Sequence, residues 1–138
     1  MQDSITKSIN NWLLNIDIIK NNYKDIKIEE VDGVKQLALQ RSGVEVLQNY
    51  FKGRKEQYSY VLFLQENSEG NSNKIKNFDW LDDLVDAIDT KVRKGDLPKH
   101  DTKQFTNCEC ANAISYEVSQ NGNITNYQLQ LNFKITTF

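Results

Sequence analysis

The chain has 138 residues, of which 26% are charged and 38% are apolar. This length suits one hydrophobic core and is too short for two, so we expect a single domain spanning residues 1–138. The composition excludes a disordered chain, and the net charge of −2 provides no overall basic surface for the phosphates of nucleic acid. No run approaches about 18 apolar residues, and the beginning of the chain lacks the pattern of a signal peptide. We therefore expect a cytosolic protein without a membrane segment.

The first predicted helix covers residues 4–16. Ser4 is a preferred N-cap residue, and apolar side chains follow it at helical spacing: Ile5, Ile9, Trp12, Leu13 and Ile16. Next come residues 26–28 and 34–40, which flank Asp32-Gly33, a strong signal for a hairpin turn.

Residues 44–50 and 58–64 are rich in β-branched and aromatic side chains, which predicts two strands at the centre of a sheet. The polar segment Lys52–Lys55 between them reads as the tip of a hairpin. Residues 65–77 contain almost no apolar side chain and many Asn, Ser and Gly residues, so we expect a mobile surface loop there.

A second amphipathic helix is predicted over residues 78–94. Its apolar side chains recur at steps of three and four residues: Phe78, Leu81, Leu84, Val85, Ile88 and Val92. Four aspartates occupy the opposite side: Asp79, Asp82, Asp83 and Asp86. Gly95 is suited to the left-handed residue that ends a helix, and Pro98, the only proline, prevents the helix from resuming.

The C-terminal part predicts strands. One strand is expected over residues 105–114, and residues 116–118 and 127–135 flank a turn at residues 121–123. The last of these strands alternates apolar and polar residues, which indicates one buried and one solvated face. Together the elements predict an α+β fold, with an antiparallel β-sheet and two main helices packed on one face.

A search for catalytic chemistry finds no constellation of an enzyme. The only histidine, His100, lies beside Asp101 in a polar segment without a nucleophile, and the phosphate-binding and nucleophile motifs are missing. Cys108 and Cys110 have no second pair and no nearby histidine to complete a zinc site, so we interpret them as small apolar side chains on one face of a strand. We expect no cofactor and no metal.

Two concentrations of charge are the candidate interaction sites. Asp79, Asp82, Asp83 and Asp86 form either a solvated helix face or a stripe that binds a partner. At the predicted hairpin tip, Lys52, Arg54 and Lys55 lie beside the aromatic residues Tyr50, Phe51 and Tyr58. This group has three readings: a solvated turn flanked by core aromatic residues, a protein-binding site, or a surface on which nucleic-acid bases stack.

Several short patterns occur in the order found in one protein family. They are the first helix with Trp12-Leu13, the strand ending Tyr50-Phe51-Lys52-Gly53 before Tyr58, the helix with Trp80 that ends at Gly95-Asp96-Leu97-Pro98, and the final Tyr127-Gln128-Leu129-Gln130-Leu131 strand. In this order they resemble the small minor capsid or tail-terminator proteins of phages, which are encoded among head–tail joining and tail genes.

The resemblance implies a structural role. Such proteins are α+β subunits without catalytic residues, which form rings, commonly hexamers, that cap the tail tube and offer a surface to the head connector. A prophage or a phage-tail-like bacteriocin would use the same part. The resemblance thus implies a tail tube protein and head–tail connector proteins as partners, no readout of nucleic-acid sequence, and a location in the host cytoplasm during assembly and later in the virion or tail-like particle.

Ring formation requires one patch of a subunit to meet a different patch of its neighbour. The acidic helix face and the basic hairpin tip have opposite charges and form a candidate pair that steers association. Under this hypothesis, changing Asp82 and Asp86 to lysine abolishes rings. The alternative functions are a small monomeric binding, adaptor or immunity-like module and, less favoured by the missing motifs, an enzyme.

Overall fold

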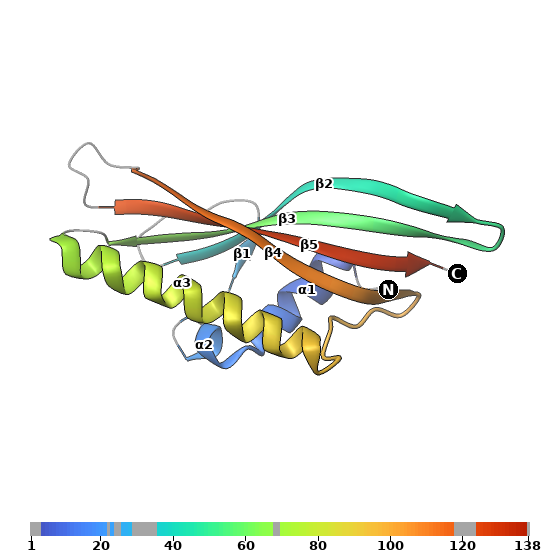
Figure 1. The fold of residues 1–138 in the computed structure, drawn as a ribbon, viewed down its shortest axis with the longest axis horizontal. Coiled ribbons are helices and arrows are strands. Elements are labelled where there is room, and N and C mark those ends of the chain that lie inside the picture. Colours follow the sequence, from blue (N-terminus) through green and yellow to red (C-terminus); the bar gives the residue numbers. More distant parts are fainter. Residues whose placement is uncertain are drawn as a thin grey trace.

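The computed structural model describes residues 4–21, 23, 26–28, 36–67, 70–117 and 124–137. These residues form an α+β fold in which helices cover one face of a long, twisted sheet (Figure 1). The helices are α1 (Ile5–Leu14), α2 (Asp17–Lys20) and α3 (Gly70–Arg93), and the strands are β1 (Lys27–Ile28), β2 (Gln36–Tyr50), β3 (Gly53–Asn67), β4 (Lys103–Glu117) and β5 (Ile124–Thr137). The predicted fold class is confirmed.

The sheet has the strand order β1-β2-β3-β5-β4. The four long strands pair antiparallel, so the centre of the sheet consists of β3, flanked by β2 and β5. The connection between β2 and β3 is shorter than predicted: only Phe51 and Lys52 lie in the turn, while Arg54 and Lys55 already belong to β3. Each pairing runs almost the full length of its strands, which makes the sheet long and narrow (Figure 1).

The predicted pairing of residues 26–28 with residues 34–40 as a hairpin is wrong. β1 pairs parallel to β2, with Lys27 opposite Ala38 and Ile28 opposite Leu39. The Asp32-Gly33 turn itself lies outside the described residues. A turn signal depends only on neighbouring residues, whereas the direction of a strand depends on which of its side chains the core buries. Here the core buries Ile26, directly before β1. Ile26 therefore contributes to the core although no hairpin leads from it.

The surface loop predicted at residues 65–77 is also replaced by regular structure. β3 continues to Asn67, where it still pairs with β5, and α3 begins at Gly70, eight residues before the predicted start. The buried side chain of Asn77 donates a hydrogen bond of 3.2 Å to the Tyr127 hydroxyl, and the Phe78 ring meets the Tyr127 ring edge to face at 5.3 Å. These contacts join the first half of α3 to β5.

The C-terminal strands are longer than predicted. Residues 105–114 and 116–117, predicted as parts of two strands, belong to the single strand β4, which pairs with β5 along its length, and residue 118 lies outside the described residues. The predicted hairpin of β4 and β5 is confirmed, although its predicted turn at residues 121–123 lies outside the described residues. Two register shifts interrupt the pairing, at Phe105/Asn107 and Ala111/Ala113. Such bulges increase the local twist of a strand pair.

The helix ends agree with the capping residues in the sequence. Ser4 caps α1 by accepting a hydrogen bond from the backbone N–H of Lys7 at 3.0 Å. The predicted helix 4–16 is confirmed but ends earlier, at Leu14, and the separate short helix α2 begins at Asp17. At the end of α3, Gly95 has φ +78°, the left-handed conformation that glycine adopts without steric cost.

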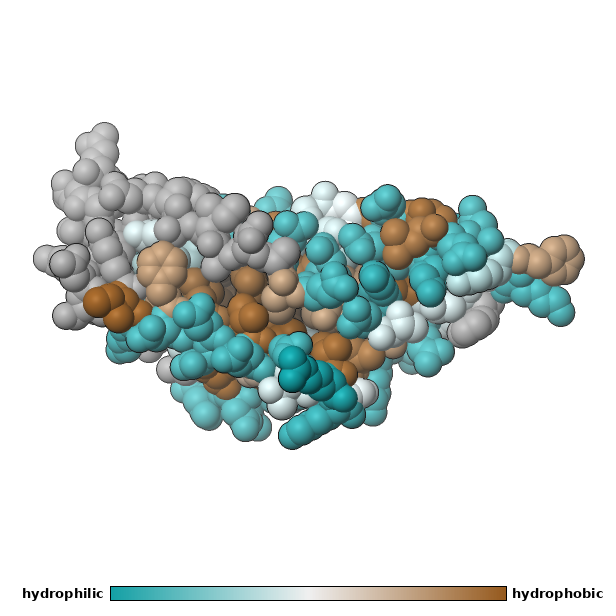
Figure 2. All heavy atoms as spheres, in the orientation of Figure 1, coloured by the Kyte–Doolittle hydropathy of each residue, from teal (hydrophilic) through white to brown (hydrophobic). Residues whose placement is uncertain are grey.

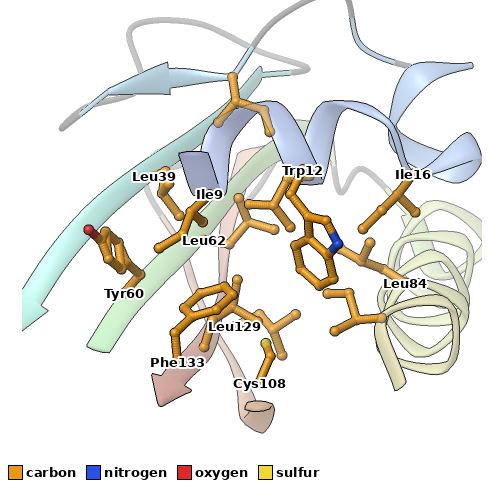
Figure 3. Close-up of a cluster of buried hydrophobic side chains, with 14 of the residues drawn as sticks. Ile9, Trp12, Ile16, Leu39, Tyr60, Leu62, Leu84, Cys108, Leu129 and Phe133 are labelled. Atoms are coloured by element: carbon orange, nitrogen blue, oxygen red, sulfur yellow. The ribbon is translucent and has the colours of Figure 1, made fainter. Parts of the chain in front are cut away.

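The core lies between the sheet and the helices. The alternating side chains of β5 are all buried as predicted: Tyr127, Leu129, Leu131, Phe133 and Ile135. At its centre the Phe133 ring meets the rings of Trp12, Tyr60 and Phe105 edge to face, with centroids 5.9 to 6.1 Å apart. Figure 3 shows Trp12 of α1 and Leu84 of α3 pointing toward the same apolar cluster. One apolar layer thus joins both main helices to the sheet.

Candidate assembly surfaces

The far end of the β2–β3 hairpin projects beyond the helices (Figure 1). Residues 40–50 of β2 are all exposed, and among the described residues no strand pairs with their outer edge. The exposed apolar side chains of this end are Val44, Val46, Leu47, Tyr50 and Phe51. Phe51 is 100% exposed, so the reading of Tyr50 and Phe51 as core aromatic residues is wrong, whereas Tyr58 is buried. Figure 2 shows apolar surface at the extreme end of this hairpin, next to hydrophilic side chains.

The basic residues of the hairpin differ in their surroundings. Lys52 is exposed in the turn, and neither it nor Lys55 forms an ion pair within the part of the chain that the structure describes. Arg54 Nε lies 3.1 Å from the buried carboxylate of Glu56, which also lies 3.5 Å from Lys103 Nζ. The Arg54 charge is therefore compensated within the subunit, and Lys52 is the basic group best placed to meet a partner.

The four predicted aspartates, Asp79, Asp82, Asp83 and Asp86, are all exposed on α3. None of them forms an ion pair with another described residue, whereas Asp89 on the same helix lies 2.9 Å from Arg93 Nη2. The structure does not bring this acidic side and the hairpin tip together. α3 covers one end of the sheet, and the tip projects from the other end (Figure 1).

A cavity of about 310 Å³ lies between α3 and β4. Its apolar and thiol lining consists of Val85, Ile88, Val92, Cys108 and Cys110, and its carboxylates belong to Asp86, Asp89 and Glu109. We refer to these eight residues as the α3–β4 groove. Sequence reasoning found Asp86 and the two cysteines but not the groove, because no local pattern says which helix lies against which strand.

The two cysteines behave as apolar groups in this groove. Cys108 is buried and Cys110 is half-buried. Burial raises the pKa of both thiols, that of Cys110 to about 12 with a further contribution from the charge of Asp89. A thiol with a raised pKa is a weak nucleophile at neutral pH. Over the described ranges, no three His, Cys, Asp or Glu side chains are grouped so as to hold a metal ion.

The segment with the single histidine forms a turn. The backbone N–H of Thr102 donates a hydrogen bond of 3.2 Å to His100 Nδ1. His100 and Asp101 line an open cleft of about 510 Å³ together with Pro98 and Phe105. The exposed Thr102 hydroxyl lies 3.5 Å from His100 Nδ1, so the imidazole accepts both Thr102 contacts as part of this local bend. Within the described segments, no helix combines the length and apolar character needed to cross a membrane.

The fold has a counterpart among solved structures. It is similar to a chain of the virion of the native gene transfer agent particle, with a TM-score of 0.64, and the match covers 96% of this chain and 95% of that chain. The two sequences are 7% identical, so the likeness establishes a shared fold. No protein-family model and no curated protein matches the chain.

Proposed function

We propose that this protein is a structural component of a phage-like particle, which caps the tail tube as a ring and joins it to the head or terminates tail growth. The observation that carries the proposal is the fold shared with a chain of the gene transfer agent virion over almost the full length of both chains. A phage, a prophage or a tail-like bacteriocin would each use such a part. The protein would act in the host cytoplasm during assembly and remain in the finished particle.

The surfaces of the protein suit a subunit that associates head to tail. The apolar and basic end of the β2–β3 hairpin and the acidic side of α3 are different patches on different parts of the subunit. Contacts between unlike patches generate rings when the rotation closes. We propose a ring, commonly a hexamer in proteins of this kind, with a tail tube protein on one side and head–tail connector proteins on the other. Its task is mechanical and requires no catalytic group or cofactor.

Electron microscopy of particles made without this protein tests the proposed function. If the protein terminates or joins tails, its absence gives tubes of uncontrolled length or tails without heads. Complementation with the intact gene restores tails of uniform length. Normal particles in the absence of the protein would refute the role.

A further inference from the structure

We infer that the tip of the β2–β3 hairpin of one copy docks into the α3–β4 groove of the next copy, with Phe51 against the apolar lining and Lys52 beside Asp86. This inference rests on the proposed ring and names the two surfaces that would build it.

The hairpin tip presents an exposed aromatic side chain beside a positive charge. Phe51 is fully exposed at the end of a two-residue turn, where its ring contacts no described residue within the subunit. Aromatic side chains that enter a pocket are the typical source of binding energy at an interface. Lys52 follows directly and brings a positive charge to the same place. The tip is therefore complementary to an apolar pocket with a negatively charged rim.

The α3–β4 groove has this chemistry. Its lining offers Val85, Ile88 and Val92 from α3, and the volume of about 310 Å³ is sufficient, since a cavity of roughly 150 Å³ already accepts benzene. Two of its carboxylates are paired within the subunit, as Glu109 lies 3.8 Å from Lys134 and Asp89 lies 2.9 Å from Arg93.

Asp86 is the groove carboxylate that forms no ion pair with a described residue. It is exposed, so its negative charge is accessible to Lys52 of another copy. Opposite charges at the edge of an apolar contact steer two surfaces into register.

The tip cannot fill the groove of its own subunit. Cys108 in the groove opposes Phe133, which in turn opposes Tyr58, so these three residues form one row across the sheet. Phe51 lies seven residues beyond Tyr58 along the hairpin, a separation of roughly 20 Å at the rise of a β-strand. The occupant must therefore be a second copy, and contacts between these two different patches are heterologous, as a ring requires.

Two variants that each damage one patch test the contact. The tip variant is Phe51→Ser with Lys52→Glu, and the groove variant is Asp86→Lys with Asp89→Lys. In a solution of one variant, every copy has the same damaged patch, so the intact patch of one copy finds no intact patch on another. Self-association of each variant alone therefore weakens at least tenfold. An equimolar mixture forms dimers and nothing larger, because the intact tip of the groove variant fits the intact groove of the tip variant. Sedimentation velocity of the full chains measures these states.

Matched controls separate this contact from a general effect of charge or of apolar surface. Asp82→Lys with Asp83→Lys places the same charges on α3 outside the groove, and Ile75→Ser removes another exposed apolar side chain. Both controls retain the association of the wild-type chain. Loss of association in the aspartate control would show that the whole acidic side of α3, not the groove, is the contact.

Cross-linking tests the contact even when association is weak. Lys52→Cys in one chain and Glu109→Cys in another, both with Cys110→Ser so that the half-buried native thiol of the groove is removed, are joined by a short thiol-specific reagent if the tip meets the groove. Neither single variant alone in this background gives the same product. Absence of this product at high protein concentration overturns the inference. If the groove variant still forms rings and still supports tails of normal length, the named contact is wrong while the proposed function stands. Tails of uncontrolled length with the groove variant support both the named contact and the proposed function.

Discussion

The two ends of the sheet are built from the same strands but have opposite surroundings. In β2, Leu37 and Leu39 are at most 1% exposed, whereas Val44 and Val46 are 45% and 47% exposed a few residues later. Both pairs have the β-branched or aliphatic side chains that favour a strand. The difference arises because the helices lie beneath one end only (Figure 1). Burial stabilises the covered end, and the projecting end has apolar surface available for a partner.

The largest contrast between the two ends is expected for their aromatic residues. Phe133→Ala removes a fully buried ring that meets three other rings, and it should lower the free energy of unfolding by about 3 to 5 kcal/mol. Phe51→Ala should change it by less than about 0.5 kcal/mol. Urea unfolding of the monomer followed by circular dichroism measures both. Equal losses would mean that Phe51 packs within the subunit.

Glu56 is a buried carboxylate in the projecting half of β3. Glu56→Ala removes the partner of Arg54 and Lys103 and should cost about 2 kcal/mol of stability, the usual range for hydrogen bonds to charged groups. Glu45→Ala, on the exposed part of β2, provides the control and should be close to neutral. The midpoint of urea unfolding reports both. A neutral Glu56→Ala would show that solvent already screens this cluster.

The two glycines Gly95 and Gly43 offer a smaller contrast of backbone conformation. Neither would bring an added Cβ within 4 Å of another group, so only the backbone decides. Gly95→Ala should destabilise by about 1 to 2 kcal/mol, since φ is +78° there. Gly43→Ala on the projecting end should stabilise by about 0.5 kcal/mol through the unfolded chain. Thermal unfolding measures the two shifts, and shifts of the same sign would contradict this assignment.

Thiol labelling distinguishes the ends without changing stability. The raised pKa of Cys110, about 12 against an ordinary 9.0, makes its thiolate roughly a thousandfold scarcer at pH 8. Iodoacetamide should therefore modify the native chain very slowly and the urea-unfolded chain rapidly. A cysteine introduced by Phe51→Cys on the projecting end should react rapidly in the folded protein. Mass spectrometry counts the modified thiols, and rapid reaction of the wild-type chain would contradict the burial of Cys108 and Cys110.

Patterns within a short stretch of sequence were sufficient for the fold class and for most of the elements. The spacing of Leu81, Leu84 and Ile88 identified the buried side of α3, and the alternation in β5 identified its buried face. Ser4 and Gly95 marked helix ends because capping depends on a few neighbouring backbone groups. The same reasoning failed at residues 65–77, where hydrogen bonding to β5 and the contact with Tyr127 replace the missing apolar periodicity.

How these elements face one another depends on long-range packing. Local sequence patterns identified the acidic residues of α3 and the basic residues around Phe51 as candidate surfaces. The packing of α3 against β4 determined that Asp86 borders an apolar groove whereas Asp82 does not. The limited reach of the helices determined that Phe51 is exposed. Propensity and periodicity act over a few residues, but exposure and pocket shape depend on residues far apart in the chain.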